Sequence, residues 1–183
     1  MSLSGKIALI ANAIFITCTI PIFFGFQYPM ILSYPWHKML HIFGIVMMMG
    51  NMMIGPIWIM AAMQTKDEQK LRFSFQTLAK MDIYFTIPGA ALALFNGLPL
   101  ATFYGGAMNV PWISQSLIML AVAWLFSITF VLYWQERVLK IAETGTIDKN
   151  FWKAYAQWAI WGSFVMIPFS LIYYLMVAKV PLW

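Results

Sequence analysis

The chain has 183 residues, of which 62% are hydrophobic and only 9% are charged. This composition leaves too little polar surface for a soluble globular domain and predicts an integral membrane protein. The net charge of +5 would suit a nucleic-acid partner, but the positions of the charges, described below, explain it as a signal of membrane topology instead.

The first predicted span covers residues 7–26, an apolar run long enough to cross a hydrocarbon core of about 30 Å. It is longer than the roughly 7 to 15 apolar residues of a signal peptide, so we expect a retained helix. A loop rich in Tyr and Pro, residues 27–35, leads to the second span, residues 38–62. This second span and the residue just before it contain both histidines of the protein.

Three further apolar segments are long enough to span the membrane, and they cover residues 80–100, 112–135 and 156–177. The third span contains Pro88-Gly89, which predicts a bend. Two charged segments, predicted as loops, cover residues 64–76 and 136–153. The sequence therefore predicts an all-α, five-span membrane bundle that forms one domain over residues 1–183.

The positive charges are unequally divided between the two ends of these spans. One side carries only Lys38 and Lys179, whereas the other carries Lys6, Lys66, Lys70, Arg72, Lys80, Arg137, Lys140, Lys149 and Lys153. Positively charged loops stay in the cytoplasm, so the amino terminus is expected to be cytoplasmic and the carboxyl terminus outside. We expect a multi-pass protein of the bacterial inner membrane.

Polar and small residues form a stripe along the second span. A helix advances about 100° per residue, which places on one face His37, His41, Gly44, Met48, Asn51 and Gly55. The remaining positions are apolar and suit lipid. The stripe is therefore expected to face other helices or a cofactor.

The two histidines differ in their expected roles. His41 lies inside the membrane, where an ionisable residue is a functional candidate, and imidazole is a common ligand of haem iron, copper and zinc. The alternative is a hydrogen bond from His41 to a carbonyl group of a neighbouring helix. His37, beside Lys38, is expected to be solvated or to contact lipid headgroups, with metal ligation as its alternative. A zinc site is disfavoured because the sequence offers no third ligand.

Five of the fifteen methionines lie between Met47 and Met53, and thioethers favour Cu(I). These side chains point in several directions, so the sequence favours packing over a copper site. Asn51 is expected to hydrogen-bond across helices, and Gly44 to allow close approach of a neighbour. Asp82, near the cytoplasmic end of the third span, is expected to pair with a cation, the candidates being Lys80, Arg72 and Arg137. A proton-relay role is the alternative for Asp82.

Residues 38–58, KMLHIFGIVMMMGNMMIGPIW, resemble the first conserved helix of a superfamily of small membrane proteins. The superfamily includes the CopD-like copper-resistance proteins, the HemJ-type protoporphyrinogen oxidases and relatives of unknown function. In the HemJ-type family a Lys-x-Leu-His pattern carries a haem-ligating histidine, and the matching residues here end at His41. The bend at Pro88-Gly89 is similar to the next helix of that family. The resemblance covers about residues 36–135 and implies a haem b bound through His41.

The sequence departs from the HemJ-type pattern at two places. The family's Trp-Leu-His-x-Lys-Leu motif supplies a lysine at the haem, whereas residues 112–117 read WISQSL and place Ser116 there. A serine hydroxyl is not a strong iron ligand. The family's Pro-Arg-Leu-Phe-Val-Tyr-His signature is also absent, and residues 55–58 read GPIW. The chain fits the relatives of unknown function better than either named branch.

Three functions are compatible with these observations. The first is haem-b binding for electron transfer or haem handling near the outer face, with Gly44, Met48, Asn51 and Ser116 beside the site and a sixth ligand, if any, from Met30, Met108 or Met119. The second is an accessory subunit of a respiratory or photosynthetic complex, or a homo-oligomer. The third is a HemJ-type oxidase or a CopD-like copper transporter. The sequence lacks paired carboxylates, an activated nucleophile and a phosphate-binding loop, which favours a non-enzymatic role.

Overall fold

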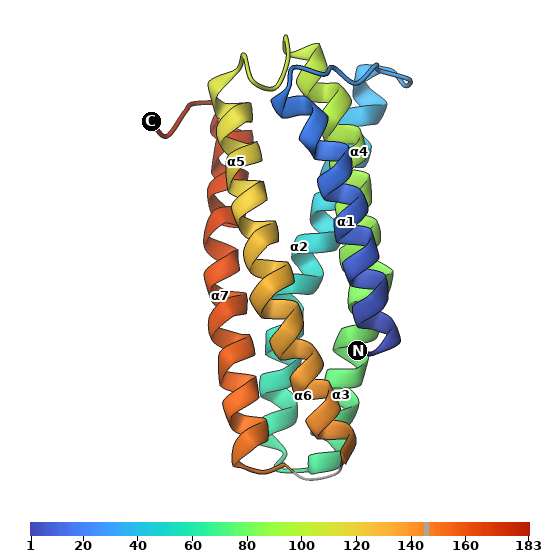
Figure 1. Cartoon of the computed structure of the whole chain (residues 1–183), viewed down its shortest axis with the longest axis vertical. Helices are drawn as coiled ribbons and strands as arrows, with labels where there is room; N and C mark the ends of the chain where they lie inside the picture. The colour runs from blue at the N-terminus through green and yellow to red at the C-terminus, as the bar shows by residue number, and fades with distance from the viewer. Residues whose placement is uncertain (145–146) are drawn as a thin grey trace.

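The computed structural model describes residues 1–144 and 147–183 as an elongated bundle of helices (Figure 1). Within these residues no strand occurs, so the predicted all-α class is confirmed. The helices are α1 (Leu3–Phe23), α2 (Tyr34–Gln64), α3 (Glu68–Met81), α4 (Ile87–Phe103), α5 (Pro111–Phe126), α6 (Leu132–Thr144) and α7 (Lys149–Ala178). Two π-helical turns, η1 (Asp82–Thr86) and η2 (Ser127–Val131), join α3 to α4 and α5 to α6.

The predicted number of spans is confirmed for the described residues. Five continuous helical segments are long and apolar enough to cross a membrane, and they cover Leu3–Phe23, Tyr34–Gln64, Glu68–Phe103, Pro111–Glu143 and Lys149–Ala178. The third and fourth segments each combine two helices and the π turn between them. The chain thus crosses the bundle five times.

The predicted boundaries were too narrow at one end of the bundle. The charged segments predicted as loops are largely helical, because α3 covers most of the first and α6 extends through much of the second. Residues 145–146 of the second segment lie outside the described residues. Both helices combine charged residues with a buried apolar face, which includes Leu71 and Phe75 on α3. A hydropathy window detects only the apolar core of such a helix and ends the span too early.

A π turn lies just before Pro88-Gly89, where the sequence predicts a bend. In η1 the backbone N–H of Ile87 donates to the carbonyl oxygen of Asp82, five residues earlier. Pro88 has no N–H to continue the α-helical pattern, so an irregularity at this position is expected on chemical grounds. The helical segment Glu68–Phe103 continues through this turn.

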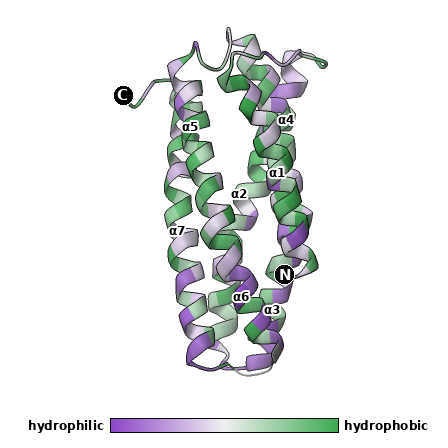
Figure 2. Cartoon of the chain, in the orientation of Figure 1, coloured by the Kyte–Doolittle hydropathy of each residue, from purple (hydrophilic) through white to green (hydrophobic). Residues whose placement is uncertain are grey.

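Hydrophilic residues gather at one end of the bundle, where α3, α6 and the start of α7 meet, and hydrophobic residues dominate the rest (Figure 2). We call this the charged end; it is the end predicted to be cytoplasmic. Asp67 and Asp148 cap α3 and α7 there, each accepting backbone N–H groups of the first helical turn. The N–H of Phe151 is the main cause of the lowered pKa of Asp148. These caps fix where both helices start.

The core of the charged end consists of one buried cluster contributed by α2, α3, α6 and α7. The ring of Phe75 packs edge-on against Phe151 and Trp158, with ring centroids 5.7 and 5.8 Å apart. Phe151 and Ile59 are completely buried. This cluster joins α2 and α3 to α6 and α7, and so fixes the position of the α2 stripe relative to α6.

Candidate functional site

The stripe along α2 faces other helices, as the sequence predicts, and at Gly44 it faces α4. The closest approach is at Gly44, where an added Cβ atom would lie 2.5 Å from the carbonyl oxygen of Gly89. An added Cβ atom at Gly89 would in turn lie 2.7 Å from the backbone of Gly44 and of Met48. Two glycines therefore face each other where α2 and α4 cross, which allows direct backbone contact. This contact fixes the position of His37 and His41, which lie on α2 on the side of Gly44 away from the charged end.

His37 lies under the connection between α1 and α2 and is 1% exposed, so the prediction of a solvated ring was wrong. Its Nε2 atom accepts the backbone N–H of Leu32 at 3.2 Å. Its Nδ1 atom lies 2.9 Å from Oδ1 of Asn96. Because Asn96 donates its Nδ2 to the carbonyl oxygen of Leu92, its Oδ1 is the acceptor and Nδ1 of His37 is the donor. Both ring nitrogens are therefore engaged.

Replacing Asn96 with leucine is expected to destabilise the protein by about 1–3 kcal/mol, because Nδ1–H of His37 would lose its partner in a buried site. The free energy of unfolding of Asn96→Leu, His37→Leu and the double variant, measured in detergent, checks this in a double-mutant cycle. The double variant should lose less than the sum of the two single changes. Strict additivity would contradict the hydrogen bond.

His41, one turn further into the membrane, is arranged differently. Its Nδ1 atom donates to the carbonyl oxygen of Ala93 on α4 at 2.6 Å. This bond sets the tautomer and leaves the lone pair on Nε2. The Nε2 atom has no hydrogen-bond partner among the described residues and is not among their enclosed unpaired atoms. His41 therefore presents an anchored ring with one free nitrogen.

Gly97 supports this position of the ring. A Cβ atom added at Gly97 would lie 2.9 Å from both Cε1 and Nδ1 of His41, so the absence of a side chain at Gly97 lets this edge of the imidazole approach α4 closely. The combination of Ala93 and Gly97, one turn apart on α4, therefore determines both the orientation and the protonation of His41.

The other predicted site residues are distributed along the bundle. Met48 packs, with Met49 and Met52, against a small cluster around Ala123 on α5. Ser116 is buried on α5, but its hydroxyl donates to the carbonyl oxygen of Trp112 in its own helix at 2.7 Å. The structure thus brings His41 and Gly44 together where α2 packs against α4, a contact that we call the α2–α4 seam. Ser116 lies on α5, and its hydroxyl group is hydrogen-bonded within that helix.

Asn51 hydrogen-bonds across helices, as predicted, and its partners lie in η1. Its Nδ2 atom donates to Oδ1 of Asp82 at 3.0 Å and to Oγ1 of Thr86 at 2.8 Å. Gln135 of α6 donates to the other carboxylate oxygen, Oδ2, at 2.8 Å. The prediction that Asp82 pairs with a cation was therefore wrong: its partners among the described residues are neutral. The carboxylate of Asp82 thus accepts hydrogen bonds from residues of α2, η1 and α6.

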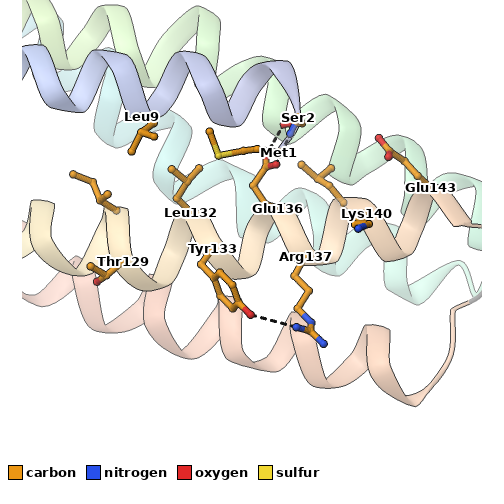
Figure 3. Close-up of a pocket in the computed structure, with 12 residues that line it drawn as sticks. Met1, Ser2, Leu9, Thr129, Leu132, Tyr133, Glu136, Arg137, Lys140 and Glu143 are labelled. Atoms are coloured by element: carbon orange, nitrogen blue, oxygen red, sulfur yellow. Dashed lines mark hydrogen bonds between the residues drawn. The ribbon is translucent and has the colours of Figure 1, made fainter.

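A cleft of about 710 Å³ lies between α1 and the helix formed by η2 and α6 (Figure 3). Glu136 connects its two walls by accepting the backbone N–H and the hydroxyl of Ser2, and Gly5 leaves room for this carboxylate. Arg137 on the same wall donates to the hydroxyl of Tyr133 at 3.2 Å. The lining contains neither histidine nor Asp82, so this cleft is separate from the stripe.

Two residues that hydrogen-bond to His37 and to Asp82 were not found from the sequence. Asn96 is a single amide in the apolar run of α4, and this polarity within a span was the available signal. Gln135 sits where the apolar run of the fourth span gives way to charged residues, so it resembles an ordinary helix end. Its role depends on the packing of α6 against α3, which no local pattern encodes.

The metal-ligating side chains are dispersed. Within residues 1–144 and 147–183 no group of three or more His, Cys, Asp or Glu side chains could hold a metal ion. His41 therefore offers a single nitrogen ligand.

Comparison with known proteins gives one match. No curated protein and no solved structure matches the chain. The model of one family, described as predicted integral membrane protein (DUF2269), matches residues 36–180. The matched region runs from the first turn of α2 past the end of α7, and so contains the complete α2–α4 seam, His41 and Asp82. The chain therefore belongs to the DUF2269 family of integral membrane proteins.

Proposed function

We propose that the protein binds haem b through Nε2 of His41 and serves electron transfer or haem handling at the end of the bundle opposite the charged end. The observation that carries the proposal is the state of the His41 ring: Nδ1 is committed to the carbonyl oxygen of Ala93, and Nε2 keeps a free lone pair. A histidine that donates its other N–H to a carbonyl group is the usual arrangement for an axial or metal ligand.

The residues on the α2–α4 seam fit one side of a haem. His41 would hold the iron, the carbonyl group of Ala93 would keep the imidazole in its binding tautomer, and Gly97 would keep the ring against α4. His37 is not needed as a ligand, because both of its nitrogens have protein partners. A bound haem would supply one-electron chemistry at its iron.

Among the described residues, His41 would be the one nitrogen ligand of the haem, because both nitrogens of His37 have protein partners. Ser116, the counterpart of the lysine in the HemJ-type motif, hydrogen-bonds within α5. A methionine thioether would be the remaining candidate for a second ligand. The resemblance of residues 36–135 to the CopD-like and HemJ-like superfamily supports haem. The departure at Ser116 argues for a haem-binding relative rather than for the oxidase itself.

Copper is the weaker alternative, because the methionines that would bind it pack against apolar side chains. Met48, Met49 and Met52 contact the cluster around Ala123, Val165 and Phe169. This arrangement agrees with their use as flexible core residues. The proposal places the protein in the bacterial inner membrane with the charged end in the cytoplasm, which follows from the distribution of lysine and arginine.

The test is the haem content of the whole chain. The protein is expressed with a haem precursor, purified in detergent, and examined by reduced-minus-oxidised absorption and by pyridine haemochrome. We expect a b-type spectrum with up to one haem per chain. A colourless preparation without extractable haem would overturn the proposal and favour the accessory-subunit hypothesis, and partner proteins that co-purify would then be identified.

A further inference from the structure

Asp82 is a carboxyl group within a membrane-spanning segment that has only neutral partners. Its Oδ1 atom accepts two hydrogen bonds, from Nδ2 of Asn51 and from the hydroxyl of Thr86, both 3.0 Å long. Its Oδ2 atom accepts one, from Nε2 of Gln135 at 2.8 Å. Three donors from α2, η1 and α6 thus converge on one acid, and Oδ2 is the oxygen with spare accepting capacity.

Among the described residues, no cation forms an ion pair with Asp82. The only ion pair in the part of the chain that the structure describes joins Lys70 and Asp67. α4 has no titratable residue. None of the titratable residues of the other elements around Asp82 hydrogen-bonds to it among the described residues. These residues are Lys6 and Cys18 on α1, Tyr34, His37, Lys38 and His41 on α2, Glu68, Lys70, Arg72 and Lys80 on α3, Tyr84 in η1, and Tyr133, Glu136, Arg137, Lys140 and Glu143 on α6. A neighbouring cation would hold the carboxyl in its ionised form, and none is in place.

The partners of Asp82 suit both forms of a carboxyl group. A side-chain amide carries two N–H donors and one carbonyl acceptor, so rotation of the Gln135 amide by half a turn exchanges a donor for an acceptor at the same place. The hydroxyl of Thr86 can also rotate. A lysine or arginine in place of Gln135 would have only donors. This set of neutral groups can therefore satisfy the acid and its anion without moving a helix.

We propose that Asp82 is a reversible proton-binding site within the bundle. A proton from the aqueous phase at the charged end forms a covalent bond to Oδ2 of the carboxylate. The hydrogen bond from Nε2 of Gln135 breaks, the amide turns, and its Oε1 accepts the new O–H group. Release reverses these steps, and Asn51 and Thr86 hold Oδ1 throughout. The site takes up one proton and keeps α2, η1 and α6 connected in both states.

The two π turns place this site. η1 carries both Asp82 and Thr86, and η2 lies one turn before Gln135, where the backbone N–H of Leu132 donates to the carbonyl oxygen of Ser127. Both turns interrupt the α-helical hydrogen-bond pattern, one at Asp82 and the other just before Gln135, and π turns are frequent at functional sites. The proposal is independent of haem, because neither His41 nor the α2–α4 crossing takes part in it.

The test is infrared difference spectroscopy of the full chain in phosphatidylcholine vesicles, recorded at acidic and alkaline pH in KCl buffer. We expect a carboxylic-acid C=O band that grows at acidic pH and falls reversibly at alkaline pH, and that is larger in the wild type than in Asp82→Asn by one group per chain. A wild-type spectrum without any Asp82-dependent change would overturn the proposal. Loss of the band at constant pH when NaCl replaces KCl would also overturn it, by indicating a sodium site.

A second variant keeps the test decisive if Asp82→Asn does not fold. Gln135→Lys should remove the Asp82 contribution, so that the band at acidic pH is smaller than that of the wild type by one group per chain, because the new ammonium group favours the ionised form of Asp82. The matched control is Gln76→Lys, which adds the same charge at an exposed position of α3 and should leave the band unchanged. Retention of the full band in Gln135→Lys, with circular dichroism unchanged, would contradict the assignment.

Discussion

Replacing His41 with alanine is expected to remove the b-type haem spectrum from the purified protein. The single anchored nitrogen with a free lone pair is lost, and no second histidine, cysteine or carboxylate among the described residues lies in a group that could take its place. The expected result is a loss of at least about tenfold in haem per chain, since second-shell changes alone typically cost 10- to 100-fold in metal affinity. Pyridine haemochrome measures it.

The matched control for this variant is His37→Gln. Glutamine keeps a donor for Asn96 and an acceptor for the backbone N–H of Leu32, which are the two functions of the His37 ring. We expect this variant to retain haem with a reduced unfolding temperature. The opposite pattern, with haem lost on changing His37 and kept on changing His41, would contradict the proposal and assign the iron to His37.

Replacing Gly44 with leucine is expected to prevent normal packing of α2 on α4. The Cβ atom would meet the backbone nitrogen of Ala93, the carbonyl oxygen of Gly89 and, at 2.8 Å, the Cβ of Leu92. Backbone atoms cannot move aside as a flexible side chain can, so the helices must separate. Overpacking of a core costs about 1–3 kcal/mol or more, and this contact has backbone on both sides. We expect a large loss of folded protein in detergent.

Gly50 provides the matched control on the same helix. Nothing lies within 4 Å of a Cβ atom built there, so Gly50→Leu should fold like the wild type. Thermal unfolding and size-exclusion profiles of the two variants, prepared side by side, check the comparison. Equal behaviour of Gly44→Leu and Gly50→Leu would contradict the close approach of α2 and α4. Gly89→Leu should behave like Gly44→Leu, because each glycine faces the backbone of the other helix.

Much of the fold could be predicted from hydropathy alone, because the bilayer requires long apolar helices and leaves few alternatives. The periodicity that placed Gly44 and Asn51 on one face of α2 was sufficient to predict that this face packs against another helix. The extent of α3 and α6 could not be obtained in the same way. Their helices continue through charged residues, where stability comes from buried residues such as Phe75 that pack against distant segments.

The candidate site could be predicted only where the chemistry is local. His41 stands out because an imidazole in an apolar span needs a hydrogen-bond partner. The carbonyl group of Ala93 is that partner for its Nδ1 atom. The burial of His37 was not predictable, because it depends on how residues 24–33 cover the end of α2. The neutral partners of Asp82 were not predictable either, because Gln135 reaches it from 53 positions away in the sequence.

Chemical complementation tests whether Nε2 of His41 holds the haem iron. Purified His41→Ala is mixed with haem, and its absorption spectrum is recorded with and without added imidazole, which can occupy the space left by the missing ring. The account predicts little specific haem binding without imidazole and recovery of the wild-type b-type spectrum with it. A wild-type haem spectrum in His41→Ala without imidazole would contradict the claim.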